Sequence, residues 1–135
     1  MAYWLLKTEP GSYSYDDLAR DKRTVWDGIK NNLALKYLRQ AKKGDAALVY
    51  HTGKEKAVVG VARVVSDPYP DPDGNEARLV VFDLEAERRL ARPVTLAEIK
   101  ADDAFADFHL VRMSRLSLMP VAPPLWKRLL KLGGA

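Results

Sequence analysis

The chain has 135 residues, of which 47% are hydrophobic and 30% charged, and its formal net charge is +4. This composition is typical of globular proteins, so we expect one domain over residues 1–135 and exclude a disordered chain. No apolar run approaches the roughly 20 residues that cross a bilayer, so we expect no membrane partner.

The residue types also limit the cofactor chemistry. With no cysteine and only two histidines, the sequence offers neither a disulfide framework nor the ligands of a zinc site, and we expect no metal. It contains no glycine-rich phosphate loop, so we expect no dinucleotide or other cofactor. The lack of cysteine fits a reducing compartment, and a cytoplasmic protein is expected.

The charges are unevenly distributed along the chain. Residues 1–65 contain 12 Lys and Arg against 7 Asp and Glu, residues 66–120 contain 7 against 11, and the last stretch adds three basic residues. A basic region beside an acidic one suits a partner that carries phosphates, because each neutralised phosphate releases counterions. A solvated surface of mixed charge would give the same counts, so charge alone does not identify the partner.

The first predicted element is a strand over residues 3–9 (YWLLKTE), which ends at a Pro-Gly turn. No basic segment precedes this apolar run, so we expect a strand rather than a secretion signal. Ser14, followed by Asp17 three residues later, resembles a capping box and predicts a short helix.

A clearer helix is predicted from residue 34 to Gly44. Four apolar side chains would share one of its faces, namely Ala34, Tyr37, Leu38 and Ala41. The opposite face would carry the basic side chains Lys36, Arg39 and Lys43.

The middle of the chain predicts three strands, over residues 45–52, 57–66 and 77–87, because these stretches are rich in aliphatic and β-branched residues. The turns between them are short, which favours antiparallel neighbours. Gly60, inside the second of these strands, indicates a bulge or a sharp bend that curls the sheet.

The remaining elements are shorter. Thr95 and Glu98 predict the capping box of a short helix, residues 115–121 predict a late strand, and Pro124 begins a final helix that ends at Gly133. Together these elements predict an α+β fold, a curled and mostly antiparallel β-barrel with short helices covering its openings.

The residues around Trp26 form a candidate binding site. Most tryptophans are core residues with one polar edge. Here Asp27-Gly28 permits a tight turn, Asn31 can hydrogen-bond a base edge, and a basic helix follows. An aromatic platform beside basic residues is typical of proteins that stack an unpaired base, an interaction worth about 1–3 kcal/mol per base.

Two further stretches carry polar candidates. His51 follows Tyr50 at a strand end, where a lone histidine is usually structural, although ligand contacts also cluster at the mouth of a barrel. In residues 7–9 (KTE), strand alternation would send Lys7 and Glu9 to one face and Thr8 to the other. A surface pair of Lys7 and Glu9 is the simpler interpretation.

Several motifs together resemble the EVE domain family of the PUA-like superfamily. They are Trp4, Lys7, Glu9-Pro10, WDGIKN (26–31), YHT (50–52), YPD (69–71) and RLSLMPV (115–121). They occur in the right order and cover nearly the whole chain. The resemblance implies a PUA-like β-barrel that acts, without catalysis, as a reader of a modified base such as methyl- or hydroxymethylcytosine in DNA or RNA.

The same resemblance implies roles for individual residues. Trp26 would be the stacking aromatic of a base pocket. Polar contacts to the base would come from Lys7, Thr8, Glu9 and Asn31, and the neighbouring strand would contribute Tyr50 and His51. The phosphates of the nucleic acid would contact Lys30, Lys36, Arg39, Lys42 and Lys43.

Two other functions stay open. Some ASCH-like relatives are small hydrolases of acylated nucleosides that use lysine, threonine and glutamate, the residue types of positions 7–9. Strand alternation argues against this reaction, because a nucleophile and its base must lie within hydrogen-bond reach. The third function is a protein-interaction domain whose final basic helix, PLWKRLLKL (124–132), docks a partner. No oligomeric state is predicted.

Overall fold

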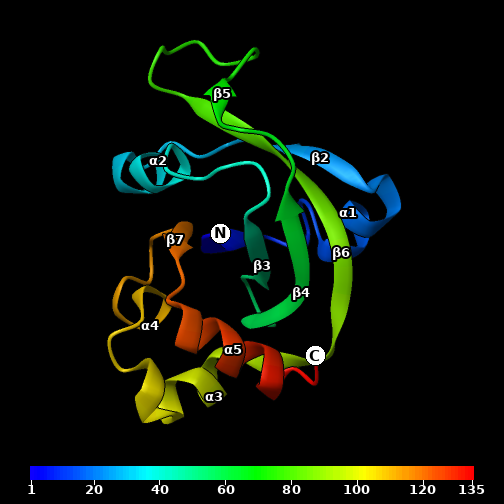
Figure 1. The fold of residues 1–135 in the computed structure, drawn as a ribbon, viewed down its shortest axis with the longest axis vertical. Helices are drawn as coiled ribbons and strands as arrows, with labels where there is room; N and C mark the ends of the chain where they lie inside the picture. Colours follow the sequence, from blue (N-terminus) through cyan, green and yellow to red (C-terminus); the bar gives the residue numbers. More distant parts are fainter.

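Seven strands form one strongly curved sheet in the computed structural model, which describes residues 1–135 (Figure 1). Their hydrogen-bonded order is β2-β6-β4-β3-β1-β7, and β5 pairs with the start of β6. The strands are β1 (Tyr3–Thr8), β2 (Arg23–Trp26), β3 (Ala46–His51), β4 (Ala57–Val64), β5 (Tyr69–Pro70), β6 (Val80–Thr95) and β7 (Leu118–Pro120).

Short helices cover the openings of this sheet. They are α1 (Tyr15–Asp21), α2 (Asn32–Leu38), α3 (Leu96–Ala101), the 3₁₀ turn η1 (Asp103–Phe105), α4 (His109–Arg112) and α5 (Pro123–Leu132). In Figure 1, α3, α4 and α5 gather at one end of the sheet and α2 lies towards the other. None of these helices has the length and hydrophobicity to cross a membrane. The predicted α+β fold, with a curled, mostly antiparallel sheet, is confirmed.

One strand pair departs from the antiparallel pattern. β1 and β3 run parallel, in a register that extends from Tyr3 opposite Ala46 to Thr8 opposite His51. Parallel neighbours need a long crossover, and here residues 9–45 supply it with α1, β2 and α2. The carboxyl ends of both strands therefore lie at the same edge of the sheet, where the Thr52 amide donates to the Thr8 carbonyl at 2.9 Å.

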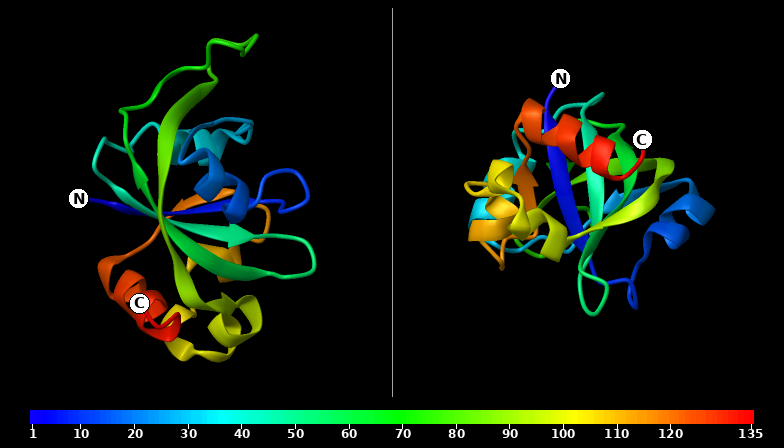
Figure 2. Two further views of the ribbon diagram at one scale, coloured as in Figure 1. Left: turned by 90° about the vertical axis from the view of Figure 1, so that its right-hand side faces the viewer. Right: turned by 90° about the horizontal axis from the view of Figure 1, so that it is seen from below.

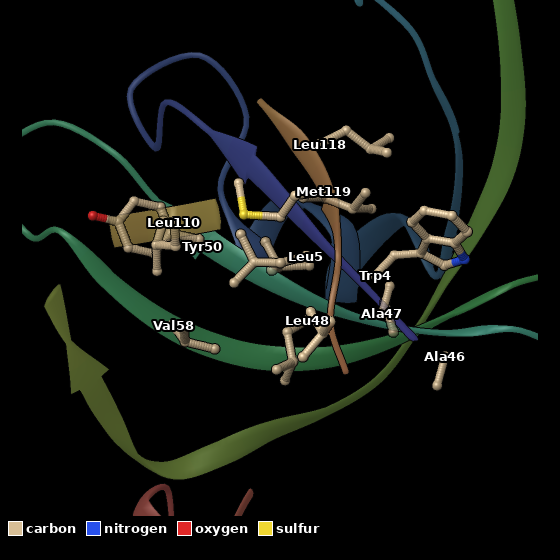
Figure 3. Close-up of a cluster of buried hydrophobic side chains, with 14 of the residues drawn as sticks. Trp4, Leu5, Ala46, Ala47, Leu48, Tyr50, Val58, Leu110, Leu118 and Met119 are labelled. Carbon is tan, nitrogen blue, oxygen red and sulfur yellow. The ribbon is translucent and has the colours of Figure 1, made fainter. Parts of the chain in front are cut away.

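The central strands are covered on both faces. All six residues of β3 are buried, and β4 exposes only Arg63. In the core, Leu5, Leu48 and Met119 pack together, with Trp4 at one end of the cluster and Tyr50 beside Leu110 at the other (Figure 3). Strands buried on both faces are expected to be continuous apolar runs, which is the pattern in residues 46–51.

A glycine in β4 makes room for a helix side chain. A Cβ atom on Gly60 would lie 2.4 Å from the ring of Tyr15, the first residue of α1. The Tyr15 hydroxyl donates to the Val61 carbonyl at 2.7 Å, and the pairing of β4 shifts register on both sides near Gly60. The bulge predicted at Gly60 is therefore confirmed, and its packing reason is the close approach of Tyr15.

A buried histidine connects β3 to the start of α1. The Nε2 atom of His51 accepts the Tyr15 amide proton at 2.9 Å, and its Nδ1 atom lies 2.7 Å from the Glu55 carboxylate. Because an amide can only donate, Nε2 is unprotonated and the Nδ1 proton faces Glu55. His51 thus satisfies one of the amides that the first turn of a helix leaves without a partner.

Two predicted element ends were wrong by more than one helical turn's worth of residues. The helix predicted to reach Gly44 ends at Leu38, because the Lys42 amide donates to the Asp45 carboxylate at 2.9 Å instead of continuing the helix. The strand predicted to end at residue 87 continues to Thr95. Its second half contains several charged residues, and pairing with β4 opposite Gly60 and Val61 keeps it extended.

A buried carboxylate joins the start of β1 to the turn before β3. Asp45 is only 4% exposed and accepts hydrogen bonds from Trp4 Nε1 at 2.9 Å, from the Ala2 amide at 3.1 Å and from the Lys42 amide. Asp45→Ala leaves these donors without an acceptor, so we expect it to lower the free energy of unfolding by about 2–4 kcal/mol. Urea denaturation measures the loss, and Asp45→Asn, which keeps one acceptor oxygen, should lose less. An unchanged urea midpoint in Asp45→Ala would contradict this role.

The cap of α3 predicts an acid-dependent stability. Hydrogen bonds from Arg92 and from the Thr95 amide lower the pKa of Glu98 from its ordinary 4.5 to about 2. Because the carboxylate is favoured in the folded state, this stabilisation is complete above pH 4.5 and is lost as the pH falls towards 2. We expect Glu98→Gln to be less stable than the wild type at pH 7 and to lose less stability between pH 5 and pH 2. Parallel pH profiles of the two proteins would refute this assignment.

Candidate functional site

A cavity of about 410 Å³ opens where edge strand β2 approaches the end of β1. Its walls also include Tyr13, the loop after β2 and Ser117, which precedes the other edge strand, β7. We call it the Trp26 cavity. Its lining residues are Lys7, Thr8, Glu9, Tyr13, Thr24, Val25, Trp26, Asp27, Gly28, Ile29 and Ser117. The cavity therefore lies at the seam between the two edges of the curled sheet.

Trp26 belongs both to this cavity and to the core. It is the last residue of β2, pairs with Phe82 of β6 and is only 7% exposed. Its ring meets the Tyr13 ring edge to face, with the ring centroids 6.4 Å apart. A small part of the indole is thus accessible from the cavity, while most of it packs in the interior. The neighbouring Val25 is 43% exposed and adds an apolar contact that the sequence reasoning missed.

Lys7, Thr8 and Glu9 all line the Trp26 cavity. The alternation expected for residues 7–9 does not separate them, because β1 ends at Thr8 and Glu9 lies beyond the strand. The Thr8 hydroxyl donates to the Tyr13 carbonyl at 2.6 Å. The Glu9 carboxylate accepts from the Gly11 amide at 3.1 Å and from the Thr52 hydroxyl at 3.3 Å. The three side chains make no hydrogen bond to one another.

Lys7 is a half-buried cation without an acidic partner. Its Nζ atom donates to the Ser114 carbonyl at 2.9 Å and lies 5.8 Å from the centroid of the Tyr50 ring. No carboxylate is within 4.0 Å of it, and burial lowers the pKa of Lys7. An ammonium group that has lost part of its hydration without gaining a counter-ion is stabilised by any anion that approaches it.

Tyr50 and His51 lie outside the Trp26 cavity. Tyr50 lines a second cavity, of about 280 Å³, which also includes Lys7 in its lining. The Tyr50 hydroxyl points away from the core cluster (Figure 3). His51 is 3% exposed, and both of its ring nitrogens are used in holding α1 and Glu55. His51 therefore anchors the first residue of α1 to the end of β3 and is not accessible to a ligand.

Asn31 also lies outside the Trp26 cavity. Its side-chain oxygen accepts the Ala34 amide proton at 3.0 Å and caps α2. It lines a third cavity, of about 330 Å³, with residues 112–116. The sequence signal for a cap was available, because asparagine before a helical pattern is a preferred N-cap residue.

The five basic residues assigned to phosphates are exposed and line none of the cavities described above. They are Lys30, Lys36, Arg39, Lys42 and Lys43. Arg39 donates to the Arg78 carbonyl at 2.5 Å. Since α2 ends at Leu38, Lys42 and Lys43 lie in the following turn and not on a continuous basic helix.

The second cavity brings together residues that the sequence keeps far apart. Lys7, Lys56 and Lys100 line it together with Tyr50 and Leu110. The sequence reasoning missed Lys56 and Lys100, and no local pattern could have found them. They meet because the Leu96 amide, at the start of α3, donates to the Lys56 carbonyl at 2.8 Å.

Comparison with known proteins identifies the family. The model of the EVE domain family matches residues 2–132. Thymocyte nuclear protein 1 of Homo sapiens is 32% identical over 126 residues, a match that covers 74% of this chain and 56% of that protein. The chain thus spans little more than half the length of this curated relative.

Solved structures agree with the family match. A protein from Rhodopseudomonas palustris has a TM-score of 0.94 at 38% identity, covering 99% of this chain and 94% of that one. Human thymocyte nuclear protein 1 (THYN1) in complex with DNA containing 5-methylcytosine has a TM-score of 0.90 at 28% identity, covering 100% and 99%. An ASCH protein from Zymomonas mobilis, at 14% identity and a TM-score of 0.64, shares the fold alone. With a family match over nearly its whole length and the same curled sheet, this chain belongs to the EVE domain family.

Proposed function

We propose that this protein is a non-catalytic DNA-binding module that reads a modified cytosine, with the base held in the Trp26 cavity. The observation that carries the proposal is this cavity, which places an aromatic edge, an exposed aliphatic side chain and carboxylates around one opening. A relative with nearly the same fold, human THYN1, is seen in complex with DNA containing 5-methylcytosine. The volume of about 410 Å³ lies within the range of small-ligand sites.

The polar groups of the cavity suit a cytosine. Carboxylates accept a hydrogen bond from the exocyclic amine of cytosine, and Glu9 and Asp27 both line the cavity. The Lys7 side chain also lines the cavity, and its ammonium group can donate to a base acceptor. Extruding a base costs a few kcal/mol, which stacking and edge hydrogen bonds offset.

Recognition of the modification needs more than contact with a methyl group. Burial of one methyl group contributes about 0.8 kcal/mol, which is only about fourfold in affinity. The exposed Val25 side chain supplies an apolar surface for a methyl or hydroxymethyl group. Stronger selectivity requires a steric or hydrogen-bond penalty against the unmodified base.

The hydrogen bonds of Thr8 support binding over hydrolysis. A threonine nucleophile needs a base within hydrogen-bond reach, whereas the Thr8 hydroxyl donates to the Tyr13 carbonyl. Hydrolysis of an acylated cytidine by the purified protein, abolished in Thr8→Ala, would overturn the non-catalytic assignment.

The first test concerns the cytosine amine. We expect Glu9→Gln to weaken binding of an oligonucleotide with one 5-methylcytosine by about 10-fold, since a good base-edge contact is worth about 1–3 kcal/mol. Fluorescence anisotropy with matched DNA and RNA strands carrying cytosine, 5-methylcytosine or 5-hydroxymethylcytosine measures the effect. Glu87→Gln is the control with the same charge change, because Glu87 pairs with Arg63 away from the cavity. Equal losses in the two variants would remove Glu9 from the base site.

The second test concerns Trp26. Trp26→Ala removes a side chain that is mostly buried and should destabilise the fold by about 3–5 kcal/mol. Trp26→Phe keeps an apolar ring at the cavity, so we expect it to fold and to bind the modified strand several-fold more weakly than the wild type. Urea denaturation of each variant separates folding from binding. If a folded Trp26→Phe and a folded Trp26→Ala both bind like the wild type, Trp26 is a core residue only.

A further inference from the structure

The second cavity differs from the Trp26 cavity in its charge. Three lysines line it, Lys7, Lys56 and Lys100, and no aspartate or glutamate does. The Trp26 cavity, by contrast, combines Lys7 with two carboxylates, Glu9 and Asp27. We call the second one the lysine cavity. Its remaining lining is Tyr50, Thr52, Gly53, Leu96, Leu110, Val111 and Ser114.

The fold places the two cavities side by side with Lys7 in both linings. Figure 2 shows the β1–α1 connection and the turn between β3 and β4 next to each other at one end of the sheet, away from the N-terminus. The hydrogen bond between the Thr52 hydroxyl and Glu9 joins these two segments. A ligand that fills the Trp26 cavity can therefore continue past Lys7 into the lysine cavity.

None of the three ammonium groups forms an ion pair within 4.0 Å in the protein. None of Lys7, Lys56 and Lys100 takes part in any of the ion pairs, which are formed by arginines and by His51. Like charges that share one cavity repel each other, and this repulsion is relieved by an anion. The Ser114 hydroxyl lines the same cavity and can donate to such an anion.

We infer that the lysine cavity binds the backbone phosphates next to the base that occupies the Trp26 cavity. This inference rests on the proposed function and moves the phosphate contacts from the surface around α2 to Lys56 and Lys100. The arrangement separates two tasks: the cavity with carboxylates and an aromatic ring receives the base, and the cavity with only cations receives the phosphodiester.

The test compares two double variants with the same charge change. Lys56→Gln with Lys100→Gln removes two cations of the lysine cavity, and Lys36→Gln with Lys43→Gln removes two exposed cations at α2 and the turn after it. Binding of a 5-methylcytosine oligonucleotide is measured by anisotropy between 50 and 200 mM salt. Each lost phosphate contact lowers the slope of log K against log salt by about 0.7–0.9. We expect a reduction of about 1.4–1.8 in the first variant and little change in the second.

Three results would overturn the inference or redirect it. Equal slopes in the two double variants would show general electrostatic attraction and no phosphate site. Lysine-dependent binding of 5-methyl-2′-deoxycytidine 5′-monophosphate, without an effect on the oligonucleotide, would assign the cavity to a free nucleotide and overturn the role in strand binding. A changed preference between modified and unmodified strands in the Lys56 and Lys100 variant would place these lysines at the base instead.

Different experimental results would refute the proposed function and the phosphate site. Wild-type protein that binds modified and unmodified strands equally would refute the base reader, whereas a slope that depends on Lys56 and Lys100 would still support the phosphate site. Both lysines are exposed, so the urea midpoint of the variant should equal that of the wild type, which makes a loss of binding attributable to the cavity.

Discussion

The parallel pairing of β1 with β3 is the constraint on which the rest of the structure depends. It is the single parallel pair in the sheet, and it brings the carboxyl ends of both strands to one edge. Residues 7–9 thereby meet residues 50–52. Residues 7–9 line the Trp26 cavity, and Lys7 lines the lysine cavity together with Tyr50 and Thr52. Had β1 paired in the antiparallel direction, its C-terminal residues would have faced the start of β3 near Asp45. The buried hydrogen bonds of Asp45 and His51 secure the two ends of this pair.

The charges around this edge are divided in a way that suits a nucleotide. A base offers amine and carbonyl groups that hydrogen-bond to carboxylates and ammonium groups, while the phosphates of a nucleotide bind cations and hydrogen-bond donors. The Trp26 cavity has both signs of charge and the lysine cavity has one, with Lys7 between them. Burial removes part of the hydration of the Lys7 ammonium group and so lowers its pKa. A bound anion would replace part of this lost stabilisation of the charged form.

Several residues that resemble ligand contacts in the sequence perform structural work instead. Asn31 caps α2, His51 holds the first turn of α1, and most of the Trp26 ring packs in the core. These roles do not compete with function in every case, because the Trp26 edge still reaches its cavity. They show that a polar side chain at the end of a helix or strand often hydrogen-bonds the backbone groups that this end leaves without a partner.

The sequence by itself determined the features that depend on neighbouring residues: the strands of the central sheet, the capping boxes at Ser14 and Thr95, the bulge at Gly60 and the motifs of the family. Tertiary structure decided the direction of the β1 and β3 pair, the extension of β6 through charged residues and the meeting of Lys7, Lys56 and Lys100. The physical reason is the sequence separation over which the stabilising interactions act. Caps and turns are set by hydrogen bonds within about four residues. The lysine cavity is set instead by the packing of segments that are far apart in the sequence, around residues 7, 56 and 100, and such packing leaves no periodic signal in the chain.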